Sequence, residues 1–144
     1  MKKNKRYPRA ISPARVGTYP ALTGAGGGSV WDVVLEYRVW CHPERGADDT
    51  EDGSDYYYAF SSYPKALAFS KKTRGAEEPL ALILQKEYID EPSPGNYVHI
   101  KKRRVTEWPV ESLSRPRRNK NTIPKLLASK RKADQILKLN KTVG

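Results

Sequence analysis

Basic side chains are the commonest candidates for chemistry in this chain, and they occur in short clusters. Lysine binds phosphate as a point charge, whereas arginine can bind it through two parallel hydrogen bonds. Such contacts give affinity and salt dependence without sequence specificity. We expect a nucleic-acid-binding site formed by these residues: Lys101, Lys102, Arg103, Arg104, Arg115, Arg117, Arg118, Lys130, Arg131 and Lys132.

The charge is segregated along the chain. Residues 1–30 contain six Lys and Arg and no acid, and residues 114–144 contain ten against Asp134 alone. Residues 31–113 contain 11 bases and 15 acids, although the whole chain carries a formal net charge of +11. A weakly acidic middle between basic segments is typical of a folded module whose tails bind a polyanion. Nucleic acid is the favoured polyanion, and an acidic protein or lipid surface is the alternative.

Cys41 and His42 are the candidates for nucleophilic chemistry. A catalytic thiolate needs a base within hydrogen-bond reach, but neighbours on a strand point to opposite faces. His99 could approach Cys41 only if their two strands are adjacent. The favoured interpretation is a half-buried cysteine at a strand end. Because Cys41 is the only cysteine, no intrachain disulfide can form, which favours the cytoplasm or an organelle matrix.

An acidic loop offers a candidate cation site. Asp48, Thr50, Asp52 and Gly53 match the first half of an EF-hand loop. Ala59 stands where the bidentate glutamate is needed, and no flanking helices are expected. A solvated loop is therefore favoured over a weak divalent-ion site, and the loop could also clasp one of the basic segments. We expect no cofactor or metal.

Aromatic side chains are numerous for so small a chain. Beside residues 101–104, rings on a sheet could stack unpaired bases, as in sheet-based RNA-binding proteins. Burial in the core and at its rim is the favoured alternative, because aromatic side chains bury large areas. The rings concerned are Tyr56, Tyr57, Tyr58, Tyr88, Tyr97 and Trp108.

The elements that must position these residues follow from the hydrophobic pattern. Apolar residues alternate through 30–41, which predicts a strand, and the aromatic run 56–60 predicts its partner. Helical spacing over 63–73 predicts a short helix. Strands are expected at 79–89, apolar on both faces and hence central, and at 97–105, closing a hairpin. The expected fold is α+β, with a small, mainly antiparallel sheet in the order strand, strand, helix, strand, strand.

The domain organisation follows the composition. Residues 1–29 are expected to form a basic, Pro- and Gly-rich extended arm, and residues 30–113 the α+β core. Residues 114–144 are expected to form a basic linker and one or two amphipathic helices. No apolar run approaches the roughly 20 residues that span a bilayer, and no secretory signal is expected. An organelle transit peptide is the less favoured interpretation of the N-terminus.

Several short stretches carry a resemblance to known proteins. They are Leu-Glu-Tyr-Arg-Val-Trp-Cys-His-Pro at 35–43, Tyr-Tyr-Tyr-Ala-Phe at 56–60, Gly-Ala-Glu-Glu-Pro-Leu-Ala-Leu at 75–82 and Thr-Glu-Trp-Pro-Val at 106–110. Over roughly residues 30–128 the chain resembles short uncharacterised bacterial proteins that carry an automatic label as GNAT-type N-acetyltransferases. The resemblance implies a small acyltransferase-like enzyme that uses acetyl-CoA.

The chain departs from the GNAT pattern at the cofactor motif. That family holds the pyrophosphate in a Gly-rich turn between a strand and a helix, so that helix N–H groups face the anion. Here Gly75 follows the expected helix and precedes a strand, so no acetyl-CoA-binding residue is assigned. The favoured function is a non-enzymatic RNA-binding protein or ribonucleoprotein component. An acyltransferase-like enzyme and an adaptor for an acidic protein are the alternatives.

Overall fold

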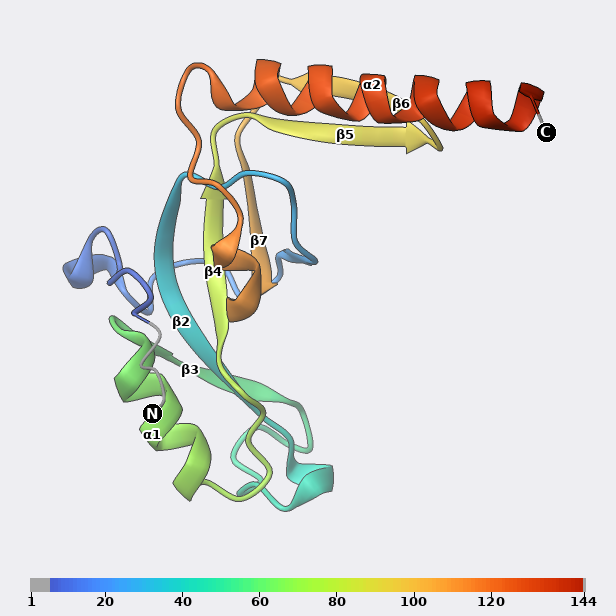
Figure 1. Cartoon of the computed structure of the whole chain (residues 1–144). Coiled ribbons are helices and arrows are strands. Elements are labelled where there is room, and N and C mark those ends of the chain that lie inside the picture. The colour runs from blue at the N-terminus through green and yellow to red at the C-terminus, as the bar shows by residue number, and fades with distance from the viewer. Residues whose placement is uncertain (1–5, 144) are drawn as a thin grey trace.

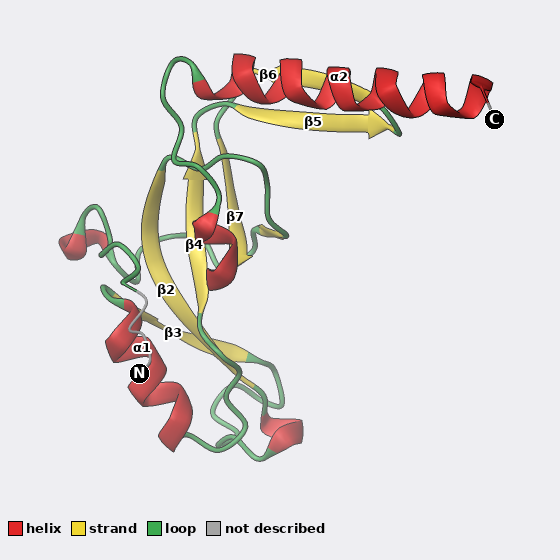
Figure 2. Cartoon of the chain, in the orientation of Figure 1, coloured by secondary structure: helices red, strands yellow, loops and turns green. Residues whose placement is uncertain are grey.

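The computed structural model describes residues 6–143 and has an α+β fold, as expected from the sequence. Figures 1 and 2 show an upright sheet with a helix at its lower end and a hairpin and long helix across its upper end. Within the described residues, the main sheet has five strands in the spatial order β1 (Gly24–Ala25), β7 (Arg104–Pro109), β4 (Leu80–Gln85), β2 (Val33–Cys41) and β3 (Tyr56–Phe60). A separate two-stranded sheet consists of β5 (Tyr88–Ser93) and β6 (Asn96–Ile100).

The pairing of the main sheet confirms a mainly antiparallel arrangement. β4 is the third of the five strands, as its continuous apolar sequence predicts, and it pairs antiparallel with β2 and β7. β1 pairs in parallel with β7. The core between the sheet and α1 (Tyr63–Lys72) contains the fully buried side chains of Tyr37, Val39, Ala66 and Trp108.

The expected hairpin forms, since segment 79–89 pairs antiparallel with segment 97–105, but each segment is divided between two strands. β4 and β7 pair within the main sheet, whereas β5 and β6 pair in the separate hairpin. The break comes at the polar pair Lys86-Glu87, where the Lys86 N–H donates to Asp32 Oδ2 at 2.7 Å. Gln85, Lys86 and Glu87 interrupt the apolar residues at this break, although a single strand was expected over 79–89.

The N-terminal residues lie along the sheet. We call residues 7–25 the N-terminal strap. Its backbone binds the folded core where the Ala10 N–H donates to Ser61 O and the Ile11 N–H donates to Val34 O. It contains one short 3-10 helix, η1 (Pro13–Arg15), and ends in β1. These two bonds hold the strap against the folded core; residues 1–5 of the expected arm lie outside the described residues.

The C-terminal segment forms one long helix, α2 (Thr122–Val143). A second apolar cluster joins α2 to the hairpin, with Val30, Ile123 and Leu127 buried against Ile89 and Tyr97. Figure 1 shows α2 lying along β5 and β6. Two more 3-10 helices, η2 (Pro43–Arg45) and η3 (Val110–Ser114), precede the acidic loop and the basic linker, respectively. No helix among the described residues is long and apolar enough to span a bilayer.

Candidate nucleic-acid interface

The main sheet and the hairpin are connected at one end of the molecule. Gln85 at the end of β4 pairs with Arg104 at the start of β7, and the hairpin begins where Tyr88 pairs with Ile100. The basic linker also passes here, since the Arg118 N–H donates to Trp31 O at 2.7 Å. We call these three connecting segments the junction: residues 86–87, 101–103 and 115–121.

Arg118 anchors the linker to the junction. Its guanidinium pairs with Asp32, with Nη2 and Nε each 2.9 Å from Oδ1, and its Nη1 lies 3.4 Å from Glu87 Oε2. The hydrogen bond to Asp32 raises the pKa of Arg118. Asp32 is buried and its other oxygen accepts the Lys86 N–H. Two carboxylates therefore already balance the charge of Arg118.

Arg104 is also held by neighbours from the protein. Its Nε donates to Gln85 Oε1 at 2.9 Å, and its guanidinium carbon lies 3.7 Å from the centre of the Tyr88 ring. Gln85 is fully buried, and its amide donates to Val30 O at 2.9 Å. The side chain of Arg104 is therefore fixed in direction, while its charge has no carboxylate partner within the described residues.

Arg115 and Arg117 bind backbone carbonyl groups and keep their charges unbalanced. Arg115 Nη1 donates to Gly28 O at 2.6 Å, and Arg117 Nε donates to Asp32 O at 2.8 Å. The Arg117 guanidinium carbon also lies 5.4 Å from the centre of the Trp31 ring. Both side chains are exposed, so their remaining N–H groups can meet a phosphate.

Lys101, Lys102 and Arg103 form the connection between β6 and β7 and are exposed. None of the three has an ion-pair partner within residues 6–143. The Lys86 side chain, in the connection between β4 and β5, is also exposed. The junction thus combines anchored guanidinium groups with a short basic loop that faces solvent.

The remaining predicted residues lie on α2. Lys130 Nζ is 5.4 Å from the centre of the Tyr97 ring on β6, while Arg131 and Lys132 are exposed. The sequence interpretation did not include Lys86 or Lys125, both of which are exposed. The polar pair at 86–87, within an apolar alternation, was the available signal for a connection at this point.

The aromatic residues divide between the two ends of the molecule. Tyr88 and Tyr97 lie beside the basic residues and contact Arg104 and Lys130. Trp108 is fully buried in the core. The run Tyr56 to Tyr58 forms β3, at the end of the main sheet away from the hairpin.

Cys41 and His42 lie apart from the basic residues and do not form a thiolate–imidazole pair. Cys41 Sγ is buried 3.9 Å from Val39 O, and burial raises the pKa of its thiol. The adjacency of strands that would let His99 approach Cys41 is not met, because His99 lies on β6 in the separate hairpin and contacts Glu87. A raised pKa disfavours the thiolate that nucleophilic catalysis needs.

His42 lies between two carboxylates. Its Nε2 contacts Glu77 Oε2, and its Nδ1 is 2.9 Å from Asp55 Oδ1, as a charge contact without hydrogen-bond alignment. Burial lowers the pKa of His42, but the two carboxylates outweigh burial and raise it above 6.5. This imidazole therefore joins the loop before β3 to the segment before β4.

The acidic loop and Gly75 have structural explanations. Asp49 Oδ1 accepts the Gly53 N–H at 2.6 Å, which closes the loop on itself. No group of three or more His, Cys, Asp or Glu side chains among the described residues is arranged to hold a metal ion.

Gly75 has φ +79, and a Cβ there would lie 2.3 Å from the Ala47 N atom. Any other residue would clash with Ala47, so the turn after α1 requires glycine at this position.

No protein-family model, curated protein or solved structure matches this chain. The acyltransferase-like activity implied by the resemblance therefore stays a prediction. A rise in melting temperature on adding millimolar acetyl-CoA would test it.

Proposed function

We propose that this protein binds RNA through the junction and α2 and acts as a component of a ribonucleoprotein. The observation that carries the proposal is the exposed loop Lys101-Lys102-Arg103, which directly precedes Arg104, whose guanidinium is held by Gln85 and Tyr88. Mobile lysine side chains lose conformational entropy when they bind a ligand, whereas guanidinium groups that the fold already holds in place lose less. A surface that carries both kinds of cationic group is suited to binding the successive phosphates of a nucleic acid.

Each set of basic residues has a distinct role in this proposal. Arg104, Arg115 and Arg117 keep unbalanced charge in fixed positions and set the path of the phosphate backbone. The loop 101–103 adds charge that adapts to the ligand. Arg118, whose charge is balanced by Asp32 and Glu87, positions the linker and does not bind phosphate.

RNA is preferred to duplex DNA because of the aromatic residues beside the charges. Tyr88 and Tyr97 are half-buried on the hairpin, next to Arg104 and Lys130. Aromatic rings within a basic surface suit unpaired bases, which RNA exposes in its loops and ends. The hairpin and α2 would then contact single-stranded segments while the junction follows the backbone.

Purification of the full chain from native lysate at low salt tests the proposed function. We expect the protein to migrate in a large complex with nucleic acid, and ribonuclease treatment to release it as a small species. Deoxyribonuclease treatment is the matched control and should leave the complex intact. Migration as a small protein free of nucleic acid in the untreated lysate would contradict the proposal.

A further inference from the structure

β3 is an edge strand, and the direction of its backbone groups can be assigned. Trp40 O accepts the Glu77 N–H at 2.8 Å, and the His42 N–H donates to Gly75 O at 2.9 Å, so Trp40 and His42 direct their backbone groups away from β3. Because these directions alternate along a strand, Val39 and Cys41 face β3. Their partners Tyr58 and Tyr56 therefore bond to β2.

Tyr57 and Ala59 alternate with those partners along β3 and therefore direct their N–H and C=O groups to its outer edge. Within residues 6–143 no other strand pairs with this edge, and no backbone or side-chain group bonds to these N–H or C=O groups. An unpaired edge is a template for an added strand. Two outward-facing residues, spaced two apart, provide one repeat of an antiparallel ladder.

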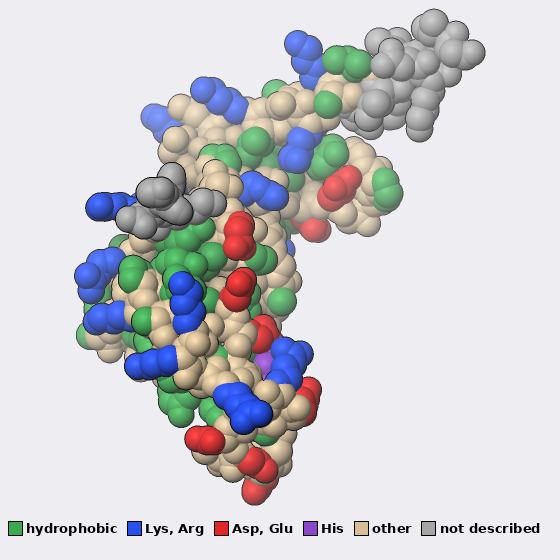
Figure 3. All heavy atoms as spheres, turned by 60° about the horizontal axis from the view of Figure 1, so that its bottom comes forward, with side chains coloured by type: hydrophobic (Ala, Val, Ile, Leu, Met, Phe, Trp, Pro, Cys, Tyr) green, Lys and Arg blue, Asp and Glu red, His purple; other side chains and the backbone are tan. Residues whose placement is uncertain are grey.

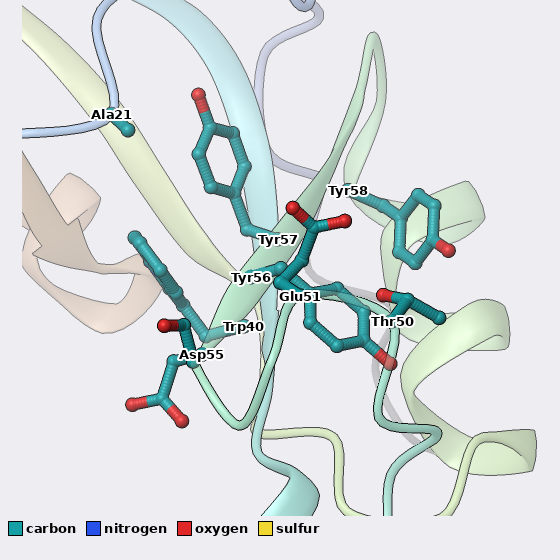
Figure 4. Close-up of a pocket in the computed structure, with 9 residues that line it drawn as sticks. Ala21, Trp40, Thr50, Glu51, Asp55, Tyr56, Tyr57 and Tyr58 are labelled. Carbon is teal, nitrogen blue, oxygen red and sulfur yellow. The ribbon is translucent and has the colours of Figure 1, made fainter.

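A hollow of about 490 Å³ lies on this edge. Tyr56, Tyr57 and Tyr58 all line it, although successive side chains of a strand point to opposite faces. Trp40 of β2 and Ala21 of the strap also line the hollow, so it extends from β3 over the neighbouring strand. Figure 4 shows Tyr57 and Tyr58 leaving the strand in different directions, with Glu51 between them in this view.

The surroundings of the hollow are acidic. Glu51 and Asp55 line it, and the loop 48–55 contains five Asp and Glu residues and no base. The Glu51 carboxylate has no ion-pair or hydrogen-bond partner among the described residues, whereas Asp55 contacts His42. In Figure 3 acidic side chains gather at the lower end of the molecule, where this loop lies.

We propose that the outer edge of β3 binds an extended, lysine- or arginine-rich segment of another protein by strand addition. The outward groups of Tyr57 and Ala59 supply the main-chain hydrogen bonds. Glu51 attracts the cationic side chains, and the rings of Trp40 and Tyr58 cover their aliphatic stems. This partner is chosen by charge, since a loop with five acids and no base repels a polyanion.

The site lies at the other end of the main sheet from the junction. A basic segment held here and RNA held at the junction can be bound by the same molecule. The inference does not depend on the proposed function, and its test contains no RNA, so the two can fail separately.

Fluorescence anisotropy of a labelled peptide tests the inference directly. The probe is an extended peptide of about nine residues, in which Lys alternates with Thr and Val, added to the full chain at low salt. We expect saturable binding that weakens as salt rises. A peptide with Glu in place of Lys should not bind, and an otherwise identical peptide with alternate amides N-methylated should also fail, because it cannot form the ladder.

Two variants with a matched control locate the site on β3. Ala59→Pro removes the N–H that faces outward but breaks no hydrogen bond to β2. The fold should therefore persist while peptide binding is lost. Ala59→Val keeps that N–H and should bind like the parent chain. Glu51→Lys should weaken binding by about fivefold, the size of one exposed charge contact.

The outcomes that overturn the inference are distinct. Failure of the basic peptide to bind at low salt would exclude it, as would equal binding by the N-methylated peptide. Unchanged binding by both Ala59→Pro and Glu51→Lys would place the peptide elsewhere. A concentration-dependent dimer that Ala59→Pro abolishes would instead assign the edge to a second copy of the chain.

Discussion

A single imidazole links the two loops at the acidic end of the molecule. His42 is buried between Glu77 and Asp55, with Arg45 as the nearby cation, which itself lies 3.6 Å from Glu77. The sequence placed His42 beside Cys41 at a strand end but could not identify its partners. Those carboxylates come from segments 13 and 35 residues away in sequence, and only the pairing of β2 with β3 and β4 brings them together.

The pH dependence of stability follows from the raised pKa of His42. The folded state favours the protonated imidazole, so its contribution to stability is complete below pH 6.5 and is lost as the pH rises through the raised pKa. We expect the free energy of unfolding, measured by urea denaturation, to fall above pH 6.5. His42→Gln should remove that fall. An NMR titration that gives His42 a pKa of 6.5 or below would contradict the assignment.

At the scale of elements, buried charges hold the N-terminal strap to the sheet. Arg38 is fully buried, with Nε 2.7 Å from Glu36 Oε2 and Nη1 3.0 Å from Glu107 Oε2. Its Nη2 donates to Pro20 O at 2.6 Å, and Glu36 Oε1 accepts the Gly17 N–H at 2.8 Å. Two carboxylates and the carbonyl groups of the strap thus satisfy one buried guanidinium.

The alternation of apolar and polar residues in β2 predicted the strand but did not predict that the N-terminal strap covers its polar face. A face carrying Glu36 and Arg38 has the composition of a solvated face, yet both side chains are fully buried beneath the strap. The apolar residues of the strap do not alternate regularly and are interrupted by prolines and glycines, so nothing in its local pattern indicates a sheet partner. Similarly, the bounds of β3 and of the short helix were predictable from local pattern, whereas the bond between the Lys86 N–H and Asp32 at the division between sheet and hairpin joins residues far apart in sequence.

Arg38→Met tests the buried charges. The variant leaves Glu36 and Glu107 without their cation, so we expect the free energy of unfolding to fall by about 3–5 kcal/mol. Arg45→Met is the matched control, because the Arg45 side chain is 58% exposed and its loss should cost less than about 1 kcal/mol. Urea denaturation followed by tryptophan fluorescence measures both. Equal, small losses in the two variants would show that the strap is not held through Arg38.

At the scale of the whole molecule, the proposed RNA interface and the acidic loop lie at opposite ends of the main sheet. The hairpin, α2 and junction carry the exposed basic residues of the proposed RNA interface, and the loop 48–55 carries the acids beside the free edge of β3. Composition predicted a weakly acidic middle between two basic segments, but not where these segments lie in space. It could not distinguish Arg118, whose charge is balanced by Asp32 and Glu87, from Lys101 or Arg103, which face solvent. That distinction depends on the path of the linker across the junction.

The salt dependence of RNA binding is the most direct test of the central claim. Substitution of Lys101, Lys102 and Arg103 by Ala should weaken binding to a single-stranded RNA and reduce the slope of log K against log salt by about 2, since each phosphate contact contributes roughly 0.7. Substitution of Lys65, Lys71 and Lys72 on α1 removes the same charge from exposed positions and should leave the slope unchanged. Equal slopes for the parent chain and both triple variants, or no RNA binding by the parent chain, would contradict the account.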